Sequence, residues 1–185
     1  MKLERQRITS DEIETVHEIL RQCGQDMKER SGLGHWDPPY PLHLLRKSAG
    51  ERMVFIVLTS GQVVATFTLG MDAPLYYRTI PGLWEAWNPQ GEPAMYVSRL
   101  AVLPTFQGQG IGTWCMDEIE AVASAAGCEA IRLDAYDKHV QLVQWYQHLG
   151  YDSKGGFSFY AETSGQTGMV CLEKLKQQFR CMKRP

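Results

Sequence analysis

The feature that most constrains this chain is a glycine-rich turn between an apolar stretch and a helical one. Residues Ala94–Val102 are mostly apolar and rich in strand formers, and residues 114–126 show helical spacing. Between them, Gly108, Gly110 and Gly112 leave backbone amides without side-chain cover. The start of a helix adds unpaired N–H donors and a partial positive charge. The segment therefore predicts an anion site of the kind that holds phosphate groups.

The spacing of this turn excludes two common phosphate loops. A dinucleotide fold requires Gly-x-Gly-x-x-Gly, which would place a glycine where this chain has Thr113. A Walker A loop requires Gly-Lys-Ser/Thr, and residues 100–113 include no lysine. The pattern that fits is Gln107-x-x-Gly110-x-Gly112 after an apolar strand. A turn with only a structural role is the less favoured alternative.

Composition narrows the class of protein. The chain has 185 residues, of which 44% are hydrophobic and 22% charged, and this predicts a single globular domain over residues 1–185. The formal net charge of −2 indicates neither a nucleic-acid partner nor a membrane surface. The charged start of the chain and the lack of a long apolar run predict a cytoplasmic protein. Five cysteines without a Cys-x-x-Cys pair predict no disulfide framework and no metal site.

The remaining segments predict an α/β chain in the order β-α-α-β-β-loop-β-α-β-α-β-β. Gly24 is expected to end the first helix and Gly150 to cap the last, while the tail 177–185 is expected to fray. The expected strands are 3–9, 53–59, 63–69, 94–102, 130–136, 157–161 and 169–175, and the expected helices are 11–24, 42–48, 114–126 and 137–150.

Two predicted loops, 31–41 and 71–93, are rich in aromatic residues. These are Trp36, Tyr40, Tyr76, Tyr77, Trp84 and Trp87. Such residues either pack onto the core or form the wall of a binding cleft, and the sequence leaves both alternatives open. In the second alternative, Trp36, Tyr40 and Trp84 bind an acceptor substrate.

The order of elements resembles the GNAT superfamily of N-acetyltransferases, most closely over residues 94–151. The resemblance implies a central mixed, mostly antiparallel sheet of about six or seven strands with about four helices, splayed at the acyl-CoA site. In that family the strand before the glycine turn pairs with the pantetheine arm of acetyl-CoA, and the turn holds the pyrophosphate. By position, the resemblance assigns these contacts to Leu100, Ala101, Val102, Gln107, Gly108, Gln109, Gly110, Ile111, Gly112 and Thr113.

A second family pattern, Asn-x-x-Ala-x-x-x-Tyr-x-x-x-Gly-Phe, matches the last predicted helix in part. Tyr146 and Gly150 match, and Tyr151 is a conservative replacement of the final aromatic residue. His139 and Leu142 replace the asparagine and the small residue. His139 either hydrogen-bonds where asparagine would or is an exposed residue at the start of a helix.

Acetyl transfer from a thioester to an amine needs a neutral amine, a donor for the developing oxyanion and a proton for the leaving thiolate. The resemblance favours Tyr146 as the proton donor, because a phenol with a pKa near ~10 keeps its proton at neutral pH. A backbone N–H near Leu100 or Ala101 is the expected oxyanion donor.

The sequence does not identify the general base. Some relatives carry a glutamate at the position of Tyr96, and Ser98 is the next residue on the same face of the strand. Glu92 and Asp134 are carboxylates near strand ends that could act through water, and ordered water alone is an equal alternative. Asp134 is also a candidate for acceptor binding.

The resemblance thus implies an acetyl-CoA-dependent N-acetyltransferase that acts on a primary amine of a small molecule by direct attack in a ternary complex. The aromatic loops favour an acceptor with an apolar or cationic part, because an ammonium group can lie against a ring face. The alternatives are a non-catalytic acyl-CoA-binding module and an acetyltransferase of a protein or peptide amine. The sequence decides neither between acetyl and longer acyl donors nor whether the chain forms a homodimer, as many relatives do.

Overall fold

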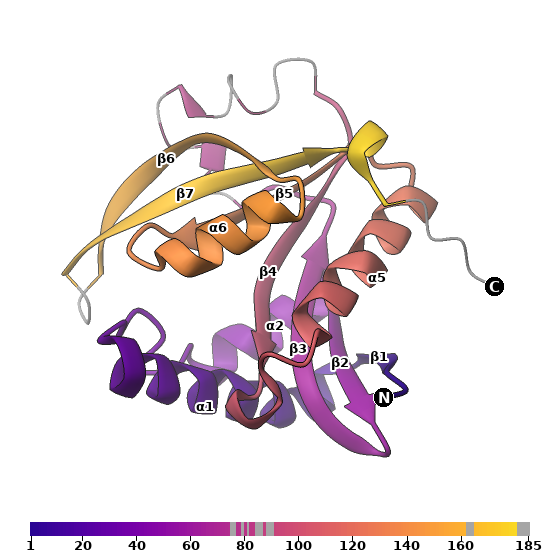
Figure 1. Ribbon diagram of the computed structural model, residues 1–185, viewed down its shortest axis with the longest axis vertical. Coiled ribbons are helices and arrows are strands. Elements are labelled where there is room, and N and C mark those ends of the chain that lie inside the picture. Colours follow the sequence, from indigo (N-terminus) through magenta and orange to yellow (C-terminus); the bar gives the residue numbers. More distant parts are fainter. Residues whose placement is uncertain are drawn as a thin grey trace. The chain divides into compact units, whose positions relative to one another are not determined.

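The computed structural model describes residues 1–74, 77, 78, 80, 82, 83, 87, 91–161 and 165–180. Among these residues, no helix is both long and apolar enough to cross a membrane. The helices and strands follow the predicted order (Figure 1): β1 Glu4–Ile8, α1 Ile13–Ser31, α2 Leu42–Glu51, β2 Met53–Thr59, β3 Gln62–Gly70, β4 Ala94–Val102, α5 Ile111–Ala125, β5 Ala130–Tyr136, α6 Val140–His148, β6 Asp152–Ala161 and β7 Gly165–Leu175.

Seven strands form one sheet in the order β1-β2-β3-β4-β5-β7-β6. The pairs β1–β2, β2–β3, β5–β7 and β6–β7 are antiparallel, and β4–β5 is parallel. The predicted mixed, mostly antiparallel sheet is therefore confirmed. The register between β4 and β5 covers only three pairs, from Ala94↔Ala130 to Tyr96↔Arg132, although β4 continues to Val102. Leu100 and Val102, which were assigned to the pantetheine arm, thus lie beyond the last of these pairs.

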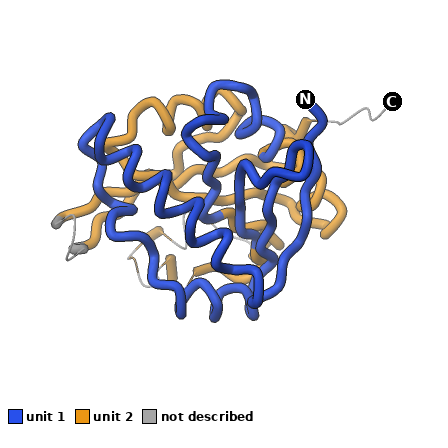
Figure 2. The backbone as a smooth tube through the Cα atoms, turned by 90° about the horizontal axis from the view of Figure 1, so that it is seen from below, with its two compact units in different colours: residues 1–69, 98–115 blue, residues 70–97, 116–185 orange. Residues whose placement is uncertain are grey.

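The chain divides into two compact units, each built from two separate segments (Figure 2). Unit 1 consists of residues 1–69 and 98–115, and unit 2 of residues 70–97 and 116–185. The chain passes from one unit to the other within β4 and within α5.

The core of unit 1 forms where α1 and α2 pack against strands. The inward face of α1 follows the predicted helical spacing, and its buried residues are Ile13, Val16, Ile19, Leu20 and Cys23. They form one cluster with Leu45 of α2, Val54 and Ile56 of β2, and Ala101 of β4. The predicted β2–β3 hairpin is confirmed, and Ser60 and Gly61 at its turn both have positive φ, at 48° and 78°.

The first helix is longer than predicted. Gly24 does not end it; α1 continues to Ser31 and is capped by Gly32, which has a left-handed φ of 67° and donates its N–H to the Lys28 carbonyl at 3.0 Å. Gly24 is needed for another reason. A Cβ at this position would lie 2.4 Å from the backbone oxygen of Trp36, so only glycine allows the 32–41 loop to approach the helix this closely.

The last two strands of unit 2 also exceed their predicted lengths, because their glycines accommodate close contacts. β6 starts at Asp152 and contains a bulge before Gly156, next to Gly155 with a φ of 99°. In β7, a Cβ at Gly168 would lie 2.0 Å from a carboxylate oxygen of Asp137. These glycines lie outside the predicted strands 157–161 and 169–175, but they belong to β6 and β7.

The end of the described chain is held by contacts to a buried ion pair in unit 2. Lys174 of β7 forms an ion pair with Glu120 of α5 at 2.7 Å, and both side chains are only 2% exposed. The Arg180 backbone N–H donates to the other Glu120 oxygen at 2.5 Å, and Lys174 Nζ lies 5.7 Å from the centre of the Tyr151 ring. We call Glu120, Lys174, Tyr151 and Arg180 the buried ion-pair cluster. The prediction that the tail frays is wrong for residues 177–180; residues 181–185 lie outside the described part.

Candidate functional site

The glycine-rich turn lies in unit 1, and α5 begins inside it. Gly108 and Gly110 have φ values of 75° and 82°, in the left-handed region that favours glycine. A Cβ added at either residue would have no atom within 4 Å, so the space above the turn is open. The first helical residue is Ile111, earlier than the predicted start at residue 114.

This early start places Gly112 and Thr113 in the first turn of α5. The first N–H groups of a helix have no partner inside it, and the helix dipole makes this end positive. The Trp114 N–H already bonds back to the Gly110 carbonyl, at 3.0 Å. The Gln107 N–H is also used, because it donates to the Pro104 carbonyl at 3.3 Å. The predicted anion donors therefore narrow to the backbone N–H groups of residues 108–113.

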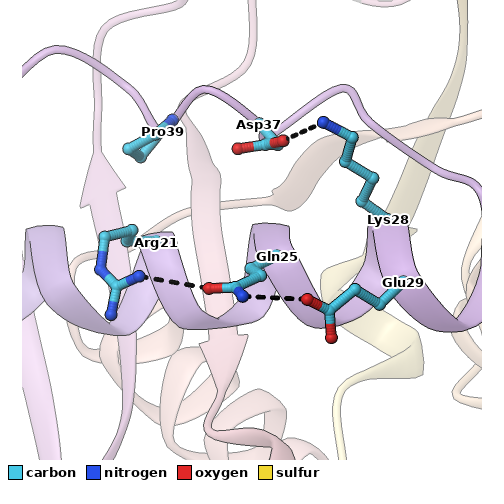
Figure 3. A pocket seen from close by; sticks show the side chains of 6 residues that line it. All are labelled: Arg21, Gln25, Lys28, Glu29, Asp37 and Pro39. Carbon is cyan, nitrogen blue, oxygen red and sulfur yellow. Dashed lines mark hydrogen bonds and ion pairs between the residues drawn. The ribbon is translucent and has the colours of Figure 1, made fainter.

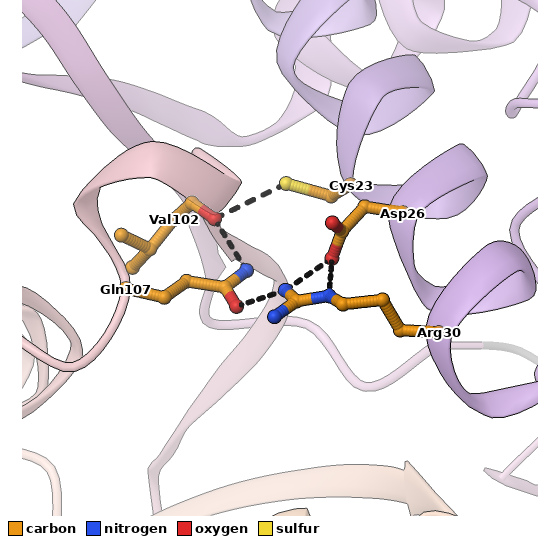
Figure 4. Close-up of polar contacts among 5 residues, drawn as sticks. All are labelled: Cys23, Asp26, Arg30, Val102 and Gln107. Carbon is orange, nitrogen blue, oxygen red and sulfur yellow. Dashed lines mark hydrogen bonds and ion pairs between the residues drawn. The ribbon is translucent and has the colours of Figure 1, made fainter.

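Side chains of α1 hold the residue at which the turn begins (Figure 4). The Gln107 amide donates from Nε2 to the Val102 carbonyl at 3.0 Å, and its Oε1 accepts from Arg30 Nη2 at 3.0 Å. Arg30 also donates from Nε to Asp26 at 2.8 Å, and Cys23 Sγ donates to the Val102 carbonyl at 3.3 Å. We call Cys23, Asp26, Arg30, Val102 and Gln107 the α1–loop cluster.

The α1–loop cluster limits which backbone group of Val102 can contact the pantetheine arm. Its carbonyl oxygen already accepts two donors, so a contact with the pantetheine arm would fall to its N–H. Burial raises the pKa of the Cys23 thiol to about 12, with a further contribution from the charge of Asp26. Cys23 therefore remains a protonated donor and is a poor nucleophile. Ala101 is buried in the core of unit 1, and Leu100 is half-buried.

In unit 2, Tyr146 lies on α6 and is 6% exposed. Its ring centre is 4.8 Å from that of Trp145 and 5.8 Å from that of Tyr151. His139 is the residue before α6, and its carbonyl accepts N–H groups of the first helical turn. Its side chain is half-buried rather than exposed, and this burial lowers its pKa. Among the described residues no partner is found for the buried His139 Nδ1.

The aromatic residues of the 71–93 segment that the structure describes belong to the core of unit 2. Tyr77 and Trp87 are each 1% exposed and pack edge to face at 4.6 Å between ring centres. This supports the core alternative for these two residues. Tyr76 and Trp84 lie outside the described residues. The Tyr77 hydroxyl donates to the carboxylate of Asp134, which is half-buried on β5.

Two candidates for the general base, Tyr96 and Glu92, contact the same arginine of unit 2. Tyr96 is 4% exposed, and its hydroxyl accepts from Arg132 Nη1 at 3.2 Å. Arg132 also pairs with Glu173 at 2.8 Å and with Glu92 at 3.9 Å. Tyr96 and Glu92 thus share a buried guanidinium in unit 2. Ser98, in contrast, belongs to unit 1 and is half-buried.

The predicted acceptor residues of the 31–41 loop have separate roles in unit 1. Trp36 packs against the core cluster, as in the structural alternative. Tyr40 is 46% exposed, but the Arg99 guanidinium lies over its ring at 4.7 Å. Arg99 also donates to the Ser48 hydroxyl at 2.9 Å. One face of the Tyr40 ring, a predicted contact of the acceptor, therefore already carries a cation of the protein itself, which the sequence did not indicate.

A shallow cavity of about 490 Å³ lies over the outer face of α1 (Figure 3). Its lining residues are Arg21, Gln25, Lys28, Glu29, Asp37 and Pro39. Lys28 is paired with Asp37, and Gln25 bonds to both Arg21 and Glu29. None of the predicted site residues lines this cavity. Within the described part of the chain, no group of three His, Cys, Asp or Glu residues could hold a metal ion.

Comparison with known proteins gives a consistent result. Residues 13–151 match the model of the acetyltransferase (GNAT) family. The chain is 35% identical over 111 residues to a thialysine N-epsilon-acetyltransferase of Mus musculus, covering 58% of this chain and 60% of that protein. It is 27% identical over 140 residues to a tRNA(Met) cytidine acetyltransferase of Nitrosococcus halophilus, covering 64% of this chain but only 18% of that protein.

Solved structures agree on the fold. The ribosomal-protein-S18-alanine N-acetyltransferase of Escherichia coli superposes with a TM-score of 0.68 at 12% sequence identity, covering 94% of each chain. The chain spans 60% and 18% of the lengths of the two curated relatives. The three relatives are named for different acceptors. The names therefore describe those proteins and leave the acceptor of this chain open.

Proposed function

Because the chain belongs to the acetyltransferase (GNAT) family, we propose that it is an acetyl-CoA-dependent N-acetyltransferase that acts on a primary amine of a small molecule. The observation that carries the proposal is the turn of residues 107–113. Gly108 and Gly110 adopt left-handed conformations with open space above them, and α5 begins directly afterwards. Open backbone N–H donors at a positive helix end suit the pyrophosphate of acetyl-CoA.

Tyr146 is the proposed proton donor to the leaving CoA thiolate. The support is its match to the family pattern and its well-packed position on α6, where two aromatic neighbours restrict its ring. A phenol retains its proton at neutral pH, so it can donate without a separate activation step. The turn belongs to unit 1 and Tyr146 to unit 2, and each therefore needs its own test.

A backbone N–H near Leu100 or Ala101 remains the proposed oxyanion donor. For the base we favour ordered water, because the Tyr96 hydroxyl is occupied by Arg132 and buried. Asp134 is the proposed contact for the acceptor ammonium group, because a half-buried carboxylate attracts a cation. The Tyr77 hydroxyl holds this carboxylate in place.

A small amine is favoured as acceptor because the curated relative at 35% identity is named for thialysine, an amino acid. We further propose that residues 1–185 form a single domain, because the family match of residues 13–151 includes parts of both units. A cytoplasmic location and a homodimer remain predictions from the sequence and the resemblance.

The experiment measures release of the free CoA thiol from acetyl-CoA with a panel of amino acids, polyamines, aminoglycosides and short peptides. Wild type should release thiol only with some amines, and Tyr146→Phe should lower kcat by about 100-fold or more. Tyr151→Phe is the matched control, because no partner is found for its buried hydroxyl among the described residues.

Three other outcomes would change the proposal. Tight acetyl-CoA binding without amine-dependent release, and with no effect of Tyr146→Phe, would favour the non-catalytic binding module. Release only with peptides would favour a protein or peptide acceptor. Failure of the wild-type protein to bind CoA would contradict the proposed role of the glycine-rich turn.

A further inference from the structure

Three polar side chains of α1 lie toward the glycine-rich turn. Cys23, Asp26 and Arg30 are spaced three and four residues apart, so they share one face of the helix. This face continues the buried stripe of α1, which includes Cys23, but its last members carry charge. Cys23 donates to the Val102 carbonyl, and Arg30 donates to the Gln107 amide oxygen (Figure 4). The final turns of α1 are therefore built against the strand end and the start of the turn.

The Gln107 side chain is fixed at both ends of its amide. Its oxygen can only accept and its nitrogen can only donate, so the two ends need partners of opposite kind. The Val102 carbonyl accepts from the nitrogen at 3.0 Å, and Arg30 donates to the oxygen at 3.0 Å. Rotation of the amide by 180° would oppose two donors at one end and two acceptors at the other. Arg30 therefore selects one orientation of Gln107.

Arg30 is itself held in place. Its Nε donates to Asp26, one helical turn earlier, at 2.8 Å, and its Nη2 contacts the same carboxylate. This pairing leaves the guanidinium aligned for Gln107 before any ligand binds. A side chain that is ordered in advance loses less entropy when the site is formed, and such preorganisation strengthens binding.

From this geometry we propose that Arg30 is a positioning residue for the CoA pyrophosphate, acting through Gln107 on the turn of residues 108–113. The inference rests on the proposed function, since it concerns the same turn. Arg30 need not touch CoA. Its role is to hold Gln107 against Val102, so that the turn begins from a fixed point and its N–H donors stay in place.

The first test compares two arginines of α1. Both are exposed and paired with a carboxylate on the same helix, but Arg21 pairs with Glu18 and Arg30 also contacts Gln107. Arg30→Met should weaken CoA binding, measured by calorimetry, about 3- to 10-fold, as expected when Gln107 must be ordered on binding instead of in advance. The KM for acetyl-CoA should rise in parallel while kcat changes little. Arg21→Met should leave both constants unchanged, and Arg30→Lys, which keeps a donor, should recover part of the affinity.

The second test is a double-mutant cycle with Gln107→Leu. If Arg30 acts through Gln107, the double variant should bind CoA no more weakly than Gln107→Leu alone. Additive losses would overturn the proposal, because they would mean that Arg30 acts by another route. An unchanged CoA dissociation constant in Arg30→Met would overturn it as well.

A third measurement does not depend on CoA. In the ligand-free protein, amide hydrogen exchange at Gln107 and Trp114, whose N–H groups bond to the Pro104 and Gly110 carbonyls on either side of the turn, should be faster in Arg30→Met than in Arg21→Met. Equal exchange in the two variants would contradict the positioning role. Faster exchange in a protein that does not bind CoA would support the positioning of the turn and refute the proposed function, so the two failures can be distinguished.

Discussion

The α1–loop cluster of unit 1 and the buried ion-pair cluster of unit 2 use similar side chains in opposite settings. Arg30 is 59% exposed and bonds to a turn that the protein leaves open. Lys174 and Glu120 are each 2% exposed and lie between α5 and β7. An exposed ion pair contributes little to stability, whereas breaking a buried pair leaves an uncompensated charge. Substitutions in the first cluster are therefore expected to change CoA binding more than stability. Substitutions in the second cluster are expected to change stability more than CoA binding.

The largest effect on stability is expected from Lys174→Met. The Glu120 carboxylate would stay buried with only the Arg180 N–H as a described donor, and the free energy of unfolding should fall by about 3–5 kcal/mol. Urea denaturation followed by circular dichroism measures this change. The double variant Lys174→Met/Glu120→Leu should recover much of the loss. If Lys174→Met were as stable as wild type, the proposed contrast between the clusters would be wrong.

A smaller effect on stability is expected from Gly110→Ala. Its φ of 82° is costly for a residue with a Cβ, and we expect a loss of about 1 kcal/mol. Gly61→Ala is the matched control, because Gly61 has a φ of 78° and equally open surroundings. Both variants should lose similar stability in urea denaturation, but only Gly110→Ala should weaken CoA binding. Equal CoA affinities for the two variants would contradict the role of the turn.

Arg30→Met should have less effect on stability than either of these changes. Its ion pair with Asp26 is exposed, so the free energy of unfolding should change by at most about 0.5 kcal/mol. The same urea denaturation measures it beside Lys174→Met. A loss comparable to that of Lys174→Met would show that the α1–loop cluster stabilises the fold and not only the turn.

The smallest effect is expected from the half-buried His139 of unit 2. Burial lowers its pKa below the ordinary value of 6.5, so the unfolded chain binds a proton more readily than the folded one. Its contribution to stability is complete above pH 6.5 and is lost as the pH falls through the lower, folded pKa. Urea denaturation at about pH 7.5 and about pH 5.5 should show a larger loss for wild type than for His139→Asn. Identical losses would rule out this source of pH dependence.

Hydrophobic periodicity predicted most of the fold, because it is a local property of the sequence. It located β2, β4 and β5 at their observed bounds and gave the correct order of elements. The predicted bounds were wrong where a glycine is required by a contact with a residue outside its own helix or strand. Gly24 was predicted to end a helix, but it is needed for the contact with Trp36. Gly168 lies just before the predicted strand 169–175, but it belongs to β7 and makes room for Asp137. Such contacts depend on tertiary structure, so a local pattern does not reveal them.

In the candidate site, too, local features were predicted and features that depend on tertiary contacts were missed. The glycine pattern predicted the turn of residues 108–113, because glycines leave backbone amides uncovered, and the structure adds that Gly108 and Gly110 have left-handed φ values. The partners of Gln107 were missed, because a helix ending at Gly24 would not include Arg30. The cation over Tyr40 was missed because Arg99 and Tyr40 are far apart in the sequence. A helix ending at Gly32 instead would have placed Cys23, Asp26 and Arg30 on one face.

The contact between Gly24 and Trp36 also has a consequence for insertions and deletions. Surface loops usually tolerate changes of length, because their backbone is free to relax. Here the Trp36 carbonyl approaches α1 at Gly24, and the helix itself ends at Gly32, so the short stretch between these two points has a set length. An added or removed residue there would shift Trp36 away from Gly24 and out of the core cluster. Length variation in this loop should therefore be confined to residues 37–41.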